Sequence, residues 1–142
     1  MTKLVIDASV AAKWLFDEPG SELADFLLSR SDMLLAPDLL HAEIGNVVWK
    51  RLDRGELDPG KTDAILEELL GAPVKLFPVS KLMREAVRIA HHYRRSFYDA
   101  SYLALAIQES CMLITADLRL SNALRDTPIG DHVCPLSEVT LR

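Results

Sequence analysis

Isolated acidic residues interrupt apolar stretches at four places in this chain, and they are the residues best suited to chemistry. Asp7 follows the apolar run LVI and Asp117 follows MLITA, whereas Glu43 lies in LLHAEIGNVVW and Asp99 in SFYDASYLALAIQ. Carboxylates rarely stay buried unless they are paired, hydrogen-bonded or bound to metal. If the fold brings the four together, their mutual repulsion favours a hard divalent cation such as Mg²⁺. The pattern therefore predicts a metal-dependent site.

Each of these acids also has a purely structural interpretation. Asp7, Asp99 and Asp117 stand where a helix can begin, so each could be an N-cap. That interpretation explains Glu43 poorly, because this residue is expected in mid-helix beside apolar neighbours. It also leaves unexplained why the acids coincide with the most apolar segments of the chain.

Two hydroxyl residues lie two positions away from two of the acids. Ser9 follows Asp7, and Thr115 precedes Asp117. Either hydroxyl could form a local cap, or it could donate a hydrogen bond that holds a metal ligand in place.

The remaining reactive and aromatic residues indicate no second site. The histidines and the two cysteines lack metal-ligand spacing, and the cysteines are interpreted as buried free thiols rather than a disulfide. The chain has no glycine-rich phosphate loop and no nucleophile elbow. Four aromatic residues are expected to pack in the core, namely Trp14, Trp49, Tyr98 and Tyr102.

Short apolar runs alternate with helical patterns, and these elements must position the acids. Strands are expected at residues 3–6, 33–37, 74–79, 111–115 and 132–136. Helices are expected at 8–16, 21–28, 38–52, 59–70, 80–95, from about 98, and at 118–125, with Ser21 and Ser80 as N-caps of the second and fifth. The alternation predicts an α/β fold with a central, mostly parallel sheet of about five strands flanked by helices. Ligands bind at the carboxyl ends of such strands, where Asp7 and Asp117 are both expected.

The length and composition are those of one globular domain over residues 1–142. Hydrophobic residues make up 49% of the chain and charged residues 26%, which argues against disorder. The longest charge-free run, 100–108, is far shorter than the roughly 20 apolar residues that a membrane span needs. An acid follows MTKLVI before any signal-peptide core can develop, so a cytoplasmic location without a membrane contact is expected.

The net charge of −5 speaks against a nucleic-acid partner, although a bound metal would offset part of it. The local distribution of charge is more informative, because residues 81–95 are rich in Lys and Arg. Helical spacing places four basic residues along one face of the predicted helix: Arg84, Arg88, His91 and Arg95. The opposite stripe is apolar: Leu82, Ala86, Ile89 and Tyr93. The basic stripe is either a solvated outer face of a helix or a surface that contacts RNA phosphates.

Four sequence motifs follow one another along the chain: DASVAAKWLFDEPG, PDLLHAEIGNVVWK, FYDASYLALA and LITADLRL. Together they resemble a PIN domain, and more narrowly the VapC-type toxin ribonucleases of bacterial toxin–antitoxin pairs. The resemblance spans residues 3 to about 137 and implies a central parallel sheet between helices. It places the acidic quartet of the family on Asp7, Glu43, Asp99 and Asp117, with Ser9 at the usual small-hydroxyl position.

The resemblance implies a Mg²⁺- or Mn²⁺-dependent ribonuclease that a VapB-like antitoxin blocks. Asp7 and Asp99 would hold the first metal, with Glu43 and Asp117 completing the site, although Glu43 could instead orient or deprotonate the water. Some relatives carry a further acid after the fourth, and here only Asn122 could take its place.

The resemblance also implies a homodimer, for which four apolar residues could supply the interface if they are not in the core: Leu23, Phe26, Leu27 and Leu66. Two other functions remain open. One is a catalytically silent PIN-fold binding module. The presence of all four acids argues against it, because their repulsion would serve no purpose in a binding module. The other is a nuclease directed at DNA or at flap structures, which would use the same metal site.

Overall fold

The computed structural model describes residues 2–30 and 32–139, which contain one parallel sheet of five strands. The strands are β1 (Lys3–Ile6), β2 (Met33–Pro37), β3 (Val74–Phe77), β4 (Met112–Thr115) and β5 (Val133–Pro135). Their order across the sheet is β3-β2-β1-β4-β5, and every neighbouring pair runs parallel. The predicted α/β class and central parallel sheet are confirmed.

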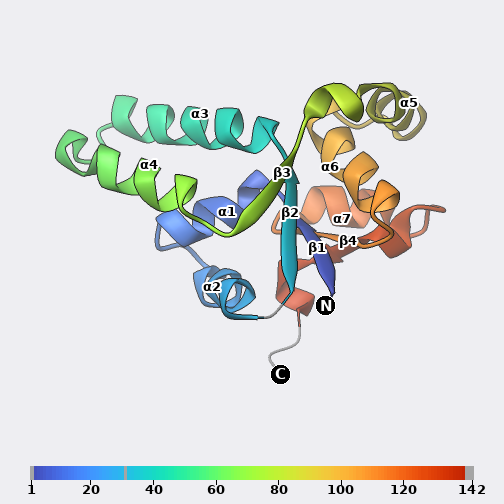
Figure 1. Cartoon of the computed structure of the whole chain (residues 1–142), viewed down its shortest axis with the longest axis horizontal. Helices are drawn as coiled ribbons and strands as arrows, with labels where there is room; N and C mark the ends of the chain where they lie inside the picture. The colour runs from blue at the N-terminus through green and yellow to red at the C-terminus, as the bar shows by residue number, and fades with distance from the viewer. Residues whose placement is uncertain (1, 31, 140–142) are drawn as a thin grey trace.

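Helices cover both faces of this sheet. They are α1 (Ala8–Leu15), α2 (Ser21–Ser29), α3 (Leu39–Asp53), α4 (Thr62–Leu70), α5 (Met83–Tyr93), α6 (Phe97–Gln108) and α7 (Leu118–Leu124). Helices α1 to α4 lie on one side of the sheet and α5 to α7 on the other (Figure 1). Right-handed crossovers explain this division, because the chain winds from β1 out to β3 and then returns across the sheet to β4 and β5.

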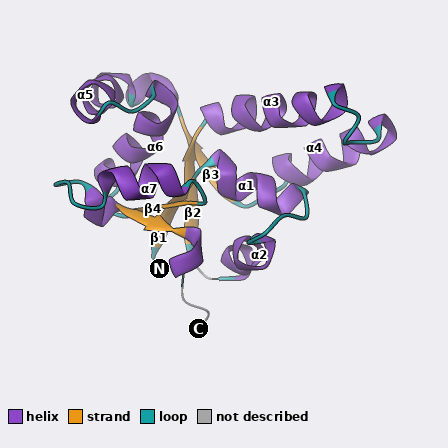
Figure 2. Cartoon of the chain, turned by 180° about the vertical axis from the view of Figure 1, so that it is seen from behind, coloured by secondary structure: helices purple, strands orange, loops and turns teal. Residues whose placement is uncertain are grey.

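The two helical layers enclose the sheet (Figure 2). Buried side chains of the strands and helices form one core cluster. The central strands are buried on both faces, and Val5 pairs with the equally buried Leu35 and Leu113. Helix α6 is buried over the whole stretch 100–106, because it lies against β1, β2 and β4 and is apolar on all sides. This central helix carries Asp99 in its first turn.

Two helix starts differ from the prediction. Gly20, with φ of 93°, takes the N-cap position of α2. Ser21 instead closes the preceding turn, since its hydroxyl donates to the Phe16 carbonyl at 3.1 Å and accepts from the Glu18 N–H at 3.0 Å. Ser80 lies inside a short 3-10 turn, Val79–Lys81, and α5 begins only at Met83.

The prediction that four aromatic residues pack in the core is correct for two of them. Trp14 is buried and donates its indole N–H to the Ala24 carbonyl at 2.8 Å, and Tyr102 is buried in α6. Trp49 and Tyr98, however, are 57% and 58% exposed. Trp49 lies beside the buried stripe of α3, and Tyr98 belongs to the first turn of α6, which precedes the buried stretch.

The basic helix α5 is shorter than predicted. Arg84 and Arg88 are exposed on its outer face, as the spacing indicates, while Ala86 and Ile89 are buried. Arg94 ends the helix by adopting the left-handed conformation, with φ of 57°. Arg95 therefore follows the helix and does not continue the basic stripe.

Neither a disulfide nor a membrane span occurs in the described part of the chain. Cys111 and Cys134 are free thiols, although they are only half-buried. None of the helices within residues 2–30 and 32–139 is long and apolar enough to cross a bilayer.

Candidate active site at the carboxyl ends of β1 and β4

Two of the four acids meet where the strand order changes direction. The chain leaves β1 toward β2 on one side and leaves β4 toward β5 on the other, although β1 and β4 are neighbours. The carboxyl ends of such a pair of strands frame a crevice in which open parallel sheets bind ligands. Asp7 directly follows β1, and Asp117 follows β4 after one residue.

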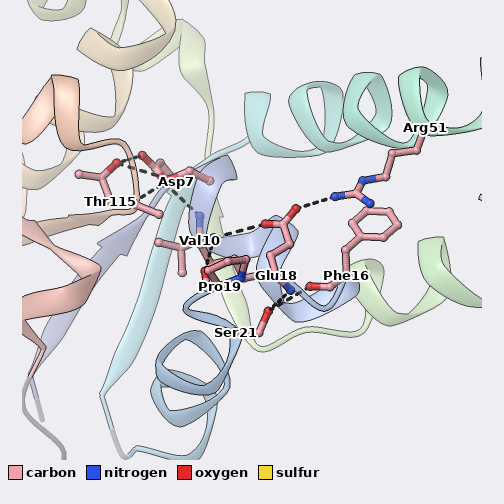
Figure 3. Close-up of polar contacts among 11 residues, drawn as sticks. Asp7, Val10, Phe16, Glu18, Pro19, Ser21, Arg51 and Thr115 are labelled. Carbon is pink, nitrogen blue, oxygen red and sulfur yellow. Dashed lines mark hydrogen bonds and ion pairs between the residues drawn. The ribbon is translucent and has the colours of Figure 1, made fainter. Parts of the chain in front are cut away.

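Asp7 is buried and fixed by hydrogen bonds to both of its carboxylate oxygens. It is only 7% exposed. Its Oδ1 accepts from the Ser9 hydroxyl at 2.5 Å and from the Val10 N–H at 3.2 Å, and its Oδ2 accepts from the Thr115 hydroxyl at 2.5 Å (Figure 3). The bond to Val10 makes Asp7 the N-cap of α1, but the two hydroxyl bonds go beyond what a cap requires.

The same hydroxyls link the ends of the two strands. Ser9 Oγ accepts from the Ala116 N–H at 2.9 Å, and Thr115 Oγ1 accepts from the Asp117 N–H at 3.0 Å. Each hydroxyl thus holds the Asp7 carboxylate while it is itself held by the backbone after β4. Ser9 and Thr115 therefore fix where Asp7 lies relative to Asp117.

Asp117 and Asp99 stand at the starts of α7 and α6 but differ in their structural roles. Asp117 is the N-cap of α7, accepting from the Arg119 N–H at 3.0 Å and the Leu120 N–H at 3.4 Å. Helix α6 is capped by Ser96, whose hydroxyl oxygen accepts from the Asp99 N–H at 3.0 Å. The Asp99 carboxylate is consequently left without a capping role.

Glu43 comes from α3, on the opposite face of the sheet from α6, and a tyrosine joins the two helices. The Tyr102 hydroxyl donates to Glu43 Oε1 at 2.8 Å. Sequence reasoning assigned Tyr102 only to the core and missed this contact. A signal was present, because Tyr102 lies three residues after Asp99 and hence on the same face of α6.

Electrostatic coupling shows that the four acids share one neighbourhood. Burial raises the pKa of Asp7 from its usual 3.8 to about 6, against the opposing effect of the hydroxyl bonds, and the charge of Asp99 adds to the rise. Burial also raises the pKa of Glu43, with further contributions from the charges of Asp7 and Asp99. The pKa of Asp99 is raised first by burial and then by the charge of Asp117. The repulsion expected for a cluster of acids is therefore present.

Two arginines partly offset this negative charge. Arg95 and Arg119 both act to lower the pKa of Asp99. The guanidinium of Arg119 lies 3.8 Å from Asp117 Oδ1, and its side chain is 95% exposed. Sequence reasoning missed Arg119, which follows the fourth acid by two residues. Asn122 is exposed on α7, and its side chain makes no hydrogen bond to the described residues.

The donor set suits a hydrated divalent ion better than a fully enclosed one. Among residues 2–30 and 32–139, no group of three His, Cys, Asp or Glu side chains is placed to hold a metal ion. Magnesium is commonly bound by one or two carboxylates together with water and substrate phosphates, and it prefers oxygen ligands. The carboxylates of Asp7, Glu43, Asp99 and Asp117 are oxygen donors of this kind.

A cavity of about 470 Å³ opens beside the acids, and we call it the Glu43 cavity. It is lined by Ala8, Leu39, Ala42, Glu43, Asn46, Val47 and Tyr98. Its walls thus come from α3 and from the first turns of α1 and α6, which are the elements that carry or follow the acids.

An ion pair connects α3 to the segment that follows α1. Arg51 Nη2 on α3 lies 2.6 Å from Glu18 Oε2, and its guanidinium lies 4.0 Å from the centre of the Phe16 ring (Figure 3). Lys13 Nζ also contacts Glu18, at 3.3 Å. These contacts hold α3, which carries Glu43, against the helix that begins directly after Asp7.

Comparison with known proteins identifies the family. The model of the PIN domain family matches residues 4–124, a range that includes all four acids. Ribonuclease VapC3 from Pyrobaculum aerophilum is 33% identical over 121 residues, which cover 84% of this chain and 92% of that protein. Ribonuclease VapC9 from Mycobacterium tuberculosis is 31% identical over 136 residues, which cover 96% and 98%. This chain belongs to the PIN domain family, and these curated relatives are VapC ribonucleases.

Solved structures show the same fold. The crystal structure of PAE2754 from Pyrobaculum aerophilum has a TM-score of 0.69 at 24% identity, covering 96% of this chain and 85% of that one. A toxin–antitoxin complex from Klebsiella pneumoniae contains a chain with a TM-score of 0.60 at 14% identity, covering 96% and 99%.

Proposed function

We propose that this chain is a ribonuclease toxin of the VapC type that hydrolyses RNA phosphodiester bonds with Mg²⁺ or Mn²⁺ held by Asp7, Glu43, Asp99 and Asp117. The observation that carries the proposal is that Asp7 and Asp117 follow the neighbouring strands β1 and β4 and are linked through Ser9 and Thr115. The charge of Asp99 raises the pKa of both Asp7 and Glu43, so these acids repel one another. A cation there relieves their repulsion, and the relatives of this chain are ribonucleases by name.

The residues of the site have different roles in the proposed reaction. When bound, the cation supplies a polarised water and stabilises charge on the phosphate and the leaving oxygen. Ser9 and Thr115 hold the Asp7 carboxylate in place, and its Oδ2 accepts only one hydrogen bond from the described residues, so that a lone pair remains for the cation. Glu43 Oε1 accepts a hydrogen bond from the Tyr102 hydroxyl, which leaves Oε2 either to bind the cation or, instead, to accept a proton from the attacking water. Burial raises the pKa of Glu43, which makes its carboxylate a stronger base than an exposed glutamate.

RNA binding needs positive charge, because the acidic site alone repels phosphates. Arg84, Arg88 and Arg95 are our candidates for phosphate contacts, and Arg119 joins them from the rim of the site. We place the action of the protein in the cytoplasm, where it would meet cellular RNA.

We further propose a VapB-like antitoxin as the partner and a homodimer as the toxin's own assembly. The support is the VapC naming of the relatives and the toxin–antitoxin complex among the structures with this fold. Of the apolar residues considered for the dimer interface, Leu27 is buried in the core and is excluded, whereas Leu23, Phe26 and Leu66 are only partly buried.

The test uses purified protein and matched RNA and DNA oligonucleotides with Mg²⁺, with Mn²⁺ or with a chelator. We expect RNA cleavage that requires the cation and is lost in the Asp99→Asn variant. Undiminished cleavage by Asp99→Asn in excess Mg²⁺ would contradict the site. Cleavage of DNA but not of RNA would favour the DNA-directed alternative, and no cleavage of either would favour a silent binding module.

A further inference from the structure

The Glu43 cavity has the composition of a site for a flat, partly polar ring. Its volume of about 470 Å³ falls in the range of small-molecule pockets, and most of its wall is apolar. Two of its lining residues can offer specific contacts besides the metal-site acid, namely Tyr98 and Asn46. Neither residue is needed for the core, because both are exposed.

Tyr98 offers an aromatic face at the edge of the acidic site. It precedes Asp99 in the first turn of α6 and is 58% exposed. Its only aromatic neighbour in the described chain is Phe97, whose ring meets it edge-on with centroids 6.4 Å apart. Exposing so large a ring carries no benefit for folding. Exposed aromatic rings are, however, the surfaces on which proteins stack the unpaired bases of RNA.

Asn46 offers both a hydrogen-bond donor and an acceptor. It lies three residues after Glu43, so both side chains emerge from the same face of α3. Its amide makes no hydrogen bond to other residues of the described ranges, and its side chain is exposed. An amide pairs with the edge of a base through a matched donor and acceptor.

We propose that the Glu43 cavity binds one unpaired base of the RNA next to the scissile phosphate, with the base stacked on Tyr98 and its edge hydrogen-bonded by Asn46. The proposal rests on the ribonuclease function proposed above and names the part of the substrate that this site recognises. A phosphate at the acids leaves the adjoining base within reach of the cavity, because Glu43 belongs to both. A protein segment of an antitoxin is the competing occupant, and the experiment separates the two.

The experiment measures binding and cleavage of short single-stranded RNA of random sequence. Binding is followed by fluorescence anisotropy in the inactive Asp99→Asn background, and the preference of active protein is read by sequencing the cleaved ends. We expect Tyr98→Ala to weaken RNA binding about 5- to 150-fold, which is the range measured for removal of a stacking aromatic residue. Tyr98→Phe keeps the ring and should restore binding. Asn46→Ala should flatten the base preference at one position beside the cut.

Trp49→Ala is the matched control, because Trp49 is an equally exposed aromatic residue of α3 that does not line the cavity. It should bind and cleave as wild type does. The proposal is overturned if wild type cleaves RNA while Tyr98→Ala and Asn46→Ala keep its affinity and base preference. Such unchanged RNA binding and cleavage would favour a protein segment of an antitoxin as the occupant of the cavity. Failure of wild type to cleave RNA contradicts the proposed function itself, and RNA binding in the inactive background then tests the cavity separately.

Discussion

At the scale of single residues, Asp7 shows the energetic cost of burying a carboxylate in the folded protein. Two hydroxyls and a backbone N–H stabilise its charge, yet burial still raises its pKa to about 6. The folded protein therefore binds this proton more tightly than the unfolded chain does. The stability that the protonated form contributes is fully present below about pH 4 and is lost as the pH rises through about 6.

This leads to a prediction for the metal-free protein. A rise in pKa from 3.8 to about 6 corresponds to at most about 3 kcal/mol of unfolding free energy. Without metal, Asp7→Asn should gain stability relative to wild type between pH 4 and pH 7, because Asn cannot ionise. Urea unfolding in chelator at several pH values measures the difference. The exposed Asp25→Asn serves as the control, and a gap between Asp7→Asn and wild type that stays constant with pH would contradict the prediction.

The bond from Tyr102 to Glu43 gives a second prediction at this scale. Tyr102→Phe removes the only side-chain donor to Glu43 among the described residues and frees that carboxylate to move. Loss of a partner that orients a metal-site carboxylate commonly costs about 10- to 100-fold in metal affinity or activity. We expect weaker Mn²⁺ binding by calorimetry with little change in melting temperature. Tyr93→Phe, on the neighbouring helix α5, is the control, and equal Mn²⁺ affinity in all three proteins would exclude a positioning role for Tyr102.

At the scale of elements, the sequence predicted strands and helices correctly where the apolar pattern of a segment matches its burial in the fold. All five strands appear where short apolar runs predict them. The three central strands β1, β2 and β4 are buried, whereas the edge strands β3 and β5 are only partly buried. The apolar pattern did not predict the exposure or position of residues at the ends of helices. Tyr98 follows the spacing of a core residue but lies in a turn that the core does not cover. Arg95 fits the basic stripe in sequence, but the left-handed Arg94 ends the helix before it.

In the candidate site, the sequence predicted the positions that follow from the order of the strands but not the contacts between packed helices. Asp7 and Asp117 follow strands, so the topology of the sheet fixes their position. The contacts between α3 and α6, such as the one from Tyr102 to Glu43, join residues that are 59 positions apart. Periodicity within one element carries no information about such contacts, and these require the packed structure.

A third prediction concerns the two arginines that are exposed on helix α5. Arg84 and Arg88 are exposed on its outer face, and among the described residues Arg88 is paired only with the exposed Glu85, at 3.1 Å. If they bind RNA phosphates, replacing both by Gln should weaken binding to all sequences alike. It should also reduce the salt slope by about 0.7 for each phosphate that is no longer neutralised. The measurement is anisotropy at several salt concentrations. Unchanged affinity and slope would identify a solvated helix face.

At the scale of the whole molecule, the fourth prediction concerns assembly. Leu27 belongs to the core, so an interface near α2 and α4 would have to use Leu23, Phe26 and Leu66. We expect a homodimer in the absence of antitoxin, and Phe26→Glu together with Leu66→Glu should dissociate it while the fold remains intact by circular dichroism. Light scattering at tens of micromolar checks both states. A wild-type monomer under these conditions would contradict the homodimer.

The strand order also has a consequence for how the protein is made in the cell. β1 is the first strand to leave the ribosome, but its neighbour β4 and the acid that follows it are among the later parts of the chain. Translation takes on the order of ten seconds to reach Asp117 at ordinary rates. During that time the nascent chain lacks one quarter of its acidic site and one side of its central strand. If the four acids act together as proposed, a chain that ends before Asp117 should have no nuclease activity, because it lacks both the neighbour β4 and the last of the acids.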